Sequence, residues 1–246
     1  MKINPAATPN GQAFSPFGLT FSKNYVILKL EKERSDFVRY KYPRTYHLPF
    51  SPGFTSDDKV LKDDSQFYGK RVVVTEKMDG ENTSIYNDGC HARSIDSQHK
   101  PYHSWLLNNM YNFIYDIPDN FRICGEYLYA KHSIGYDNLP SYFLAVSVWE
   151  NDKCLNWEDT KEFCGALNIA MVPILYEGVY DSDLINKIAS EAVLRGSEGI
   201  VVRIWDEFKY DDFSKSIAKY VRPNHVQTDK HWSQGIIEKN GLITND

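Results

Sequence analysis

The sequence lacks several features that would each define a class of protein. It has no apolar run long enough to span a bilayer, and residues 1–10 lack the apolar core of a signal peptide. Its four cysteines include no Cys-x-x-Cys pair, so neither a structural zinc site nor a disulfide framework is indicated. It also has no internal repeat. We therefore expect a soluble protein without membrane contact, in the reducing cytoplasm.

The chain is also poor in positive charge. It has 28 Lys and Arg residues against 33 Asp and Glu residues, a formal net charge of −5. Holding nucleic acid by bulk electrostatics requires an excess of basic residues on one face. Any such contact must then be local, and segments 39–47 and 215–222, which interleave cations with tyrosines, are candidates. A solvated, tyrosine-rich surface is the alternative interpretation of both segments.

A chain of 246 residues with 42% hydrophobic residues is long enough for one substantial core with a small appendage. Apolar periodicity predicts several strands flanked by helices, which is an α+β architecture. We expect residues 1–35 to form an N-terminal extension, with a strand at 24–30, packed on a body that spans residues 36–246. Strands are predicted at 71–77, 121–129, 142–149, 198–202 and 217–221, a hairpin at 83–93, and helices at 104–115, 157–168, 182–195 and 229–239.

The most informative segment directly follows the apolar residues Val72–Val74. The predicted strand ends on Lys77, in the pattern Lys77-Met78-Asp79-Gly80. A lysine in this place presents its amine at a fixed position, and a lysine amine can act as a covalent nucleophile. A strand that simply closes in an Asp-Gly turn is the structural alternative.

Further motifs follow in a fixed order. They are His91-Ala92-Arg93-Ser94, Gly125-Glu126, the apolar strand Tyr142–Trp149, Glu198-Gly199-Ile200-Val201-Val202 and Ala218-Lys219-Tyr220-Val221-Arg222. This series resembles the colinear motifs of the RNA ligases, within the covalent nucleotidyltransferase superfamily, and is closest to the branch of the phage T4 RNA ligase 2 nucleotidyltransferase domain. The resemblance covers about residues 41–232.

The resemblance implies a nucleotidyltransferase (ATP-grasp-like ligase adenylation) fold, with antiparallel sheets flanked by helices. Because only 24 residues follow Arg222, we expect no separate C-terminal domain. It implies an ATP-dependent RNA ligase that uses Mg²⁺, with Mn²⁺ as an alternative, and acts on RNA as a monomer. A nicked duplex and an RNA–DNA hybrid are candidate forms of that RNA. The enzyme alternatives are a DNA ligase and a GTP-using capping guanylyltransferase. A non-enzyme alternative is an inactive module that binds nucleic-acid ends.

The resemblance also implies roles for individual residues. The catalytic residues are Lys77 as the nucleophile, Glu198 as the residue that organises the metal ion through water, and Lys219 on the α-phosphate. The nucleotide-binding residues are Glu76, Asp79, Gly80, Arg93, Glu126, Val146 and Lys215. The nucleic-acid-binding residues are Asn82, Arg44 and Arg222.

Elementary chemistry adds conditions to these roles. A lysine amine is almost wholly protonated at neutral pH, so we expect Lys219, Arg93 and a metal ion to lower the pKa of Lys77. Glu126 needs a partner for its carboxylate; Arg122 and Lys131 are structural candidates, and a ribose is the functional one. The chain also departs from the family pattern at two places. Val146 stands where an aromatic side chain usually contacts the base, and the second lysine of the last motif is missing, with Lys215 or Arg222 as candidate replacements.

Overall fold

The computed structural model describes residues 13–14, 20–21, 38–224 and 237–243, and it divides the chain into two compact units, 1–39 and 40–246. In the first unit, β1 (Ala13–Phe14) and β2 (Thr20–Phe21) pair antiparallel. The predicted strand at 24–30 lies outside the described residues. So does most of the predicted helix at 229–239, whose last three residues, 237–239, are not helical.

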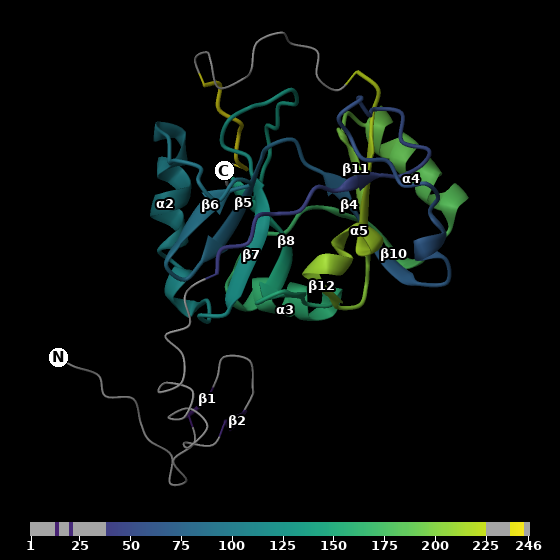
Figure 1. Ribbon diagram of the computed structural model, residues 1–246. Coiled ribbons are helices and arrows are strands. Elements are labelled where there is room, and N and C mark those ends of the chain that lie inside the picture. The colour runs from purple at the N-terminus through teal and green to yellow at the C-terminus, as the bar shows by residue number, and fades with distance from the viewer. Residues whose placement is uncertain (1–12, 15–19, 22–37, 225–236, 244–246) are drawn as a thin grey trace, which may run out of the picture. The chain divides into compact units, whose positions relative to one another are not determined.

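The second unit contains two large sheets, shown in Figure 1. The first has the strand order β10-β4-β11-β13-β3. Its neighbours pair antiparallel, except that the short strand β3 runs parallel to β13. Its strands are β3 (Tyr46–His47), β4 (Arg71–Lys77), β10 (Ile174–Val179), β11 (Gly199–Ile204) and β13 (Ile217–Val221).

The second sheet has the order β12-β9-β8-β7-β5-β6, and its neighbours all pair antiparallel. The predicted hairpin is confirmed as β5 and β6, which are joined by the two residues Asn87 and Asp88. The strands are β5 (Glu81–Tyr86), β6 (Gly89–Ala92), β7 (Phe121–Tyr127), β8 (Phe143–Glu150), β9 (Lys153–Cys154) and β12 (Phe208–Lys209).

Helices flank these sheets, which confirms the predicted α+β class. Asn156 and Asp181 cap α3 and α4 by accepting a hydrogen bond from the backbone N–H groups of Asp159 and Leu184. The predicted helix at 104–115 ends early, at Met110, and continues as turns and a short 3-10 helix. The helices are α2 (Ser104–Met110), α3 (Trp157–Ala166), α4 (Ser182–Leu194) and α5 (Phe213–Ser216), with 3-10 turns at Ser65–Phe67, Pro101–His103, Ile114–Asp116 and Tyr210–Asp212.

One face of the first sheet packs into the hydrophobic core, so a functional site can form only on its other face. Val72 and Val74 of β4 and Ile200 and Val202 of β11 are fully buried in one cluster with the apolar side of α4. Because side chains alternate along a strand, Thr75, Lys77 and Val201 lie on the opposite face. None of the helices among the described residues is long and apolar enough to cross a membrane.

Candidate active site

A cavity of about 630 Å³ is lined by residues from both sheets. The first sheet contributes alternate residues on three neighbouring strands, and the strand register brings them into rows. In one row, Val201 of β11 lies directly between Thr75 of β4 and Lys219 of β13. The second sheet contributes Asn82, Glu126 and Val146 from β5, β7 and β8.

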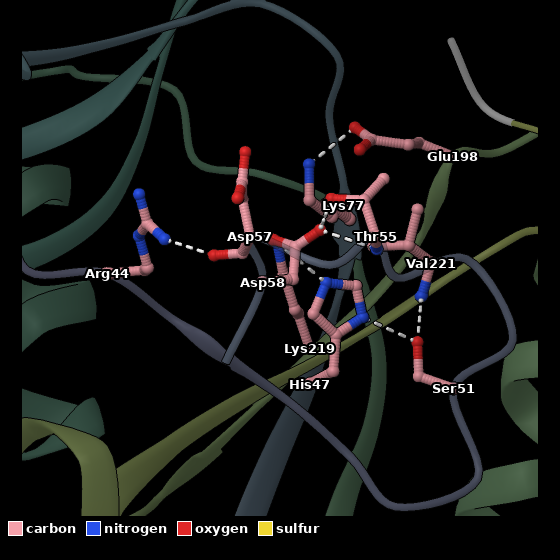
Figure 2. Close-up of polar contacts among 10 residues, drawn as sticks. All are labelled: Arg44, His47, Ser51, Thr55, Asp57, Asp58, Lys77, Glu198, Lys219 and Val221. Carbon is pink, nitrogen blue, oxygen red and sulfur yellow. Dashed lines mark hydrogen bonds and ion pairs between the residues drawn. The ribbon is translucent and has the colours of Figure 1, made fainter. Parts of the chain in front are cut away.

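Lys77 occupies the last position of β4, which confirms the prediction that a strand ends on this lysine. Gly199 is its register partner on β11, so Glu198 lies beside it. The Lys77 Nζ atom is 2.5 Å from Glu198 Oε2, and the Glu198 side chain is only 5% exposed. Figure 2 shows the two side chains reaching toward each other.

In the protein without nucleotide or metal ion, the pKa of Lys77 is raised, which is opposite to the direction expected for the site with a metal ion. Burial lowers the pKa of this amine, but the Glu198 carboxylate raises it, with Glu126 and Asp79 acting in the same direction, so its pKa lies above the ordinary value. The expected direction rested on the cations around the lysine, but acidic groups also converge on it. Lys77 is therefore an ammonium ion at rest and must lose a proton before it can act as a nucleophile.

The turn after Lys77 is fixed by Asp79 and Gly80. Asp79 Oδ2 accepts hydrogen bonds from the backbone N–H groups of Ser133 and Ile134, at 2.8 and 2.9 Å. The backbone N–H of Asp79 donates to the Tyr136 hydroxyl at 2.8 Å. A Cβ atom on Gly80 would lie 2.6 Å from the Tyr127 carbonyl oxygen, so glycine is needed there. The Lys-x-Asp-Gly pattern thus fixes the turn after Lys77 against β7 and residues 133–136, a segment whose part in the site sequence reasoning missed.

Glu126 and Asn82 are register partners across β7 and β5 and face the same cavity. Burial raises the pKa of Glu126 to about 8; Lys77 and the Gly80 N–H oppose that shift, while the negative charge of Glu198 adds to it. Near neutral pH this carboxyl group is therefore largely protonated, so it can donate as well as accept a hydrogen bond. The two cations considered as its partners are engaged elsewhere: Arg122 donates to the Asn151 carbonyl, and Lys131 pairs with Glu238.

Lys219 projects into the cavity from β13. Burial lowers the pKa of its amine, Asp58 raises it, and Lys77 lowers it again, and the net shift is downward. Its Nζ atom is 3.5 Å from Asp58 Oδ1. Asp57, Asp58 and Arg44 line the same cavity from the segment before β4, and Arg44 donates to the Asp57 carbonyl. Sequence reasoning missed Asp57 and Asp58, because an acidic pair in an irregular loop carries no motif.

Three more of the predicted residues line the cavity. Arg93 follows β6 directly and is exposed. Glu76 accepts a hydrogen bond from the Ser197 hydroxyl at 2.6 Å, which ties β4 to the start of β11. Val146 lies on β8 and presents an aliphatic surface, as do Val172 and Val201 in the same cavity.

Two predicted residues are not brought to this place. Lys215, on α5, is exposed and pairs with Asp212 at 2.8 Å, and it lines a separate cavity of about 470 Å³. Arg222 donates its backbone N–H to the Glu198 carbonyl at 2.9 Å, but among the described residues its side chain is not part of the cavity wall. Neither the Lys215 nor the Arg222 side chain is therefore placed in this cavity to replace the missing second lysine of the last motif.

The carboxylates suit a hard divalent cation, which prefers oxygen ligands. Within the described ranges, no three His, Cys, Asp or Glu side chains are arranged to hold a metal ion directly. Glu198 nevertheless contacts the cavity-lining Lys77 at 2.5 Å, and Glu126 and Asp79 are near enough to act on the same lysine charge. This donor set fits an ion that keeps most of its water and takes one carboxylate from the protein.

Comparison with known proteins gives a consistent result. A family model described as RNA ligase matches residues 70–221, or 152 of the 246 residues. A search of curated proteins found no match.

Three solved structures share the fold. An archaeal ATP-dependent RNA ligase has a TM-score of 0.53 at 17% identity, covering 74% of this chain and 48% of its own. A putative ATP-dependent DNA ligase from Aquifex aeolicus has 0.52 at 19% identity, covering 76% and 51%. A Naegleria gruberi RNA ligase mutant with ATP and Mn has 0.51 at 16% identity, covering 83% and 70%. The chain spans about half the length of the first two.

Proposed function

Because this chain belongs to the RNA ligase family, we propose that it is an ATP-dependent RNA ligase that works through a covalent lysyl-AMP on Lys77. The fold is the α+β fold shared by RNA and DNA ligase structures. One observation carries the proposal: Lys77 ends a strand in a cavity that Glu126 and Lys219 also line, from two different sheets, and it pairs there with the buried Glu198.

The first reaction forms a bond between Lys77 Nζ and the α-phosphorus of ATP and breaks the bond between that phosphorus and the bridging oxygen of the β-phosphate. Pyrophosphate leaves with the bonding electrons, and the amine loses its proton. Glu198, 2.5 Å from the amine, lies where it can accept that proton. Lys219 lies one strand beyond β11, where its charge can stabilise the α-phosphate oxygens.

Two further transfers complete the sealing reaction. The AMP passes from Lys77 to a 5′-phosphate end, which forms an anhydride and frees the lysine. A 3′-hydroxyl then attacks that 5′-phosphate, so that the two ends are joined and AMP leaves. Both transfers need in-line geometry and neutralised phosphate charge, which Lys219, Arg93 and Arg44 can supply from the cavity wall.

A divalent cation, Mg²⁺ or Mn²⁺, is part of the proposal, and Glu198 would hold it through water. When bound, such an ion supplies positive charge beside the lysine amine and the phosphate. Glu126, protonated or ionised, is suited to a ribose hydroxyl, because it is a half-buried group that faces the cavity from the second sheet. Val146, Val201 and Val172 offer an aliphatic contact for the base in place of an aromatic side chain.

RNA is the proposed substrate, either as a nicked duplex or paired with DNA, and the proposed working form is a monomer in the cytoplasm. Asn82 and Arg44 in the cavity, and Arg222 beside Glu198, would contact the polynucleotide. The family membership favours RNA, although the shared fold extends to a putative DNA ligase. A GTP-using guanylyltransferase and an inactive end-binding module are the alternatives that the test below distinguishes.

The function is tested in two steps. The protein is incubated with Mg²⁺ and each α-labelled nucleotide, and transfer of label to the protein is measured; we expect label from ATP and none from GTP. Nicked duplexes are then compared that differ only in ribose or deoxyribose at the two terminal nucleotides of the 3′-hydroxyl strand. Faster sealing of the ribose form supports RNA, because a protein distinguishes RNA through the 2′-hydroxyl and duplex shape. Equal sealing would indicate a DNA ligase, and no covalent label from any nucleotide would indicate the end-binding module.

A further inference from the structure

The segment that precedes β4 supports the strand that carries Lys219. Residues Tyr46 and His47 form β3, and they pair in parallel with Ala218 and Lys219 of β13. The backbone N–H of Leu48 donates to the Lys219 carbonyl at 2.8 Å. Both sides of this arrangement are in the second compact unit. Residues before the matched segment 70–221 therefore fix the backbone of one of its catalytic lysines.

Asp58, from the same segment, faces the side chain of that lysine. Its Oδ2 atom accepts hydrogen bonds from the Thr55 backbone N–H and hydroxyl, both at 3.0 Å, which fix the carboxylate in place. Its Oδ1 atom is 3.5 Å from Lys219 Nζ and 3.5 Å from His47 Nε2. Figure 2 shows Asp58 between His47 and Lys219, while Lys77 turns to Glu198.

His47 is not the charged partner of Asp58. Its side chain is 1% exposed, and its Nδ1 atom is 2.8 Å from the Ser51 hydroxyl oxygen, which also accepts the Val221 backbone N–H at 3.0 Å. Burial lowers the pKa of His47 to about 4, and the positive charge of Lys219 acts in the same direction. The ring is therefore neutral at pH 7, and the counter-charge of Asp58 is the Lys219 ammonium.

The surroundings of Lys219 make this contact important. Its side chain is 18% exposed, and the groups that face it are Asp58, Lys77, Glu198 and the neutral His47. Burial and the positive Lys77 both disfavour the ammonium form, and Asp58 is the leading group that favours it. Burial raises the pKa of Asp58, yet hydrogen bonds from Thr55 and the charge of Lys219 bring it down to about 2, so the carboxylate stays ionised.

We propose that Asp58 is a positioning residue for nucleotide transfer: it keeps the Lys219 ammonium charged and directed into the cavity until a nucleotide phosphate takes its place. The inference rests on the proposed function for its catalytic meaning. The 3.5 Å separation is longer than the roughly 2.8 Å of a strong charge-assisted hydrogen bond. The pair is therefore close enough to hold the charge and loose enough for a phosphate oxygen to displace Asp58.

The first test measures Lys219 directly and needs no activity. The full chain and its Asp58→Asn variant are acylated with trace acetic anhydride across a pH series, and the reactivity of each lysine is read by mass spectrometry. Asparagine keeps an oxygen for Thr55 but removes the charge. We expect Lys219 in the variant to titrate at lower pH and to react on the order of threefold to tenfold faster at pH 8, where one pKa unit corresponds to about a tenfold change.

Two matched variants make this test specific. Asp57→Asn removes the neighbouring charge from the same cavity wall, and Asp212→Asn removes the partner of the exposed Lys215. Neither should shift the Lys219 titration comparably, and circular dichroism checks that all variants fold. An unchanged Lys219 titration in Asp58→Asn, or an equal shift in Asp57→Asn, overturns the inference.

The second test measures the reaction at ATP concentrations far below saturation, where the rate reports on the free enzyme. The adenylylation rate of Asp58→Asn should stay near the wild-type value at pH 6.5 and fall about tenfold by pH 9, as Lys219 loses its proton. Asp58→Glu, which keeps the negative charge, should restore part of the adenylylation rate that Asp58→Asn loses at high pH. A variant profile parallel to the wild type at all pH values contradicts the positioning role. If the wild type takes no AMP at all while the Lys219 titration still shifts, the proposed function fails and the coupling of Asp58 to Lys219 stands.

Discussion

The two walls of the cavity differ in the groups that they present. The wall made by β4, β11 and β13 carries Lys77 and Lys219, and Lys77 is paired with Glu198. The wall made by β5, β7 and β8 presents Asn82, Val146 and a carboxyl group, Glu126, that is largely protonated near neutral pH. Under the proposed function we expect a division of work, in which the first wall supplies the charge needed at a phosphate and the second wall holds the nucleoside.

The same strands of the first wall also build the core, on their other face. Val72, Val74, Ile200 and Val202 are fully buried there. Substitutions on the cavity face of these strands should therefore change the chemistry with little loss of packing. The comparison predicts large effects on rate from the first wall and smaller effects on binding from the second.

The largest effect is expected for Lys77→Ala. The variant has no amine at the end of β4, so covalent AMP labelling should fall to background, because the nucleophile itself is removed. Labelling is measured with α-labelled ATP, with Lys215→Ala as the control, since that lysine is exposed and lines another cavity. Label at the wild-type level in Lys77→Ala, with the fold intact, would place the nucleophile elsewhere.

The next largest effect is expected for Lys219→Ala and for Glu198→Ala. Removing one preorganised charge from a transition state costs on the order of a hundredfold in rate. The single-turnover rate of lysine adenylylation at saturating ATP measures this loss. Near-normal rates in both variants would show that the first wall is not where the phosphate reacts.

The second wall is tested by Glu126→Gln, for which we expect a rise in the KM for ATP of about tenfold, equal to about 1.4 kcal/mol, with a smaller loss in the maximum rate. An equally large loss in the maximum rate would mean that Glu126 acts on the reacting phosphate, like the charged residues of the first wall, and not only on nucleotide binding.

Stability gives a separate readout for the same residue. Folding raises the pKa of Glu126 from 4.5 to about 8, so the folded protein holds this proton more tightly than the unfolded chain does. The stabilisation is complete below about pH 4.5 and is lost as pH rises through 8. Urea unfolding of wild type and Glu126→Gln at pH 5 and pH 8.5 should show the variant gaining relative stability at the higher pH, by about 1–2 kcal/mol because the open cavity screens part of the charge. No change in that difference between the two pH values contradicts the assignment.

The smallest effect is expected for Val146→Phe. An aromatic ring on this wall would add a stacking surface for a base, which is worth on the order of 1 kcal/mol, so the KM for ATP should fall several-fold. Val146→Ala is the matched control and should raise the KM slightly. A Val146→Phe variant that folds but binds ATP more weakly would show that the base lies elsewhere in the cavity.

Local patterns predicted much of this arrangement. Strand alternation and turn chemistry are local properties. They predicted the strands that carry Lys77 and Glu126, and the hairpin that turns at Asn87-Asp88. The Glu198-Gly199 motif has a cause that lies between two strands. A Cβ atom at Gly199 would lie 1.9 Å from the Tyr220 carbonyl oxygen, so β13 approaches β11 closely only beside a glycine.

Other parts could not be predicted, for equally physical reasons. The two-residue strand β3 is too short to show any periodicity, and its parallel pairing with β13 joins residues about 170 positions apart. This pairing is what brings His47 and Asp58 to Lys219, so their part in the site was missed. The high pKa of Lys77 depends on two groups distant in the sequence, Glu198 just before β11 and Glu126 on β7. Lys215 was assigned to the site although α5 carries it to a different cavity.

The central claim is that Lys77 carries the nucleotide, and peptide mapping tests it most directly. The protein is incubated with ATP and Mg²⁺, quenched in alkali and digested, and the modified peptide is sequenced by mass spectrometry. The account predicts one AMP on Lys77, in a bond that is stable in alkali and broken by acid, as a phosphoamide is. An AMP on any other residue, or an adduct that survives acid and breaks in alkali, would contradict it.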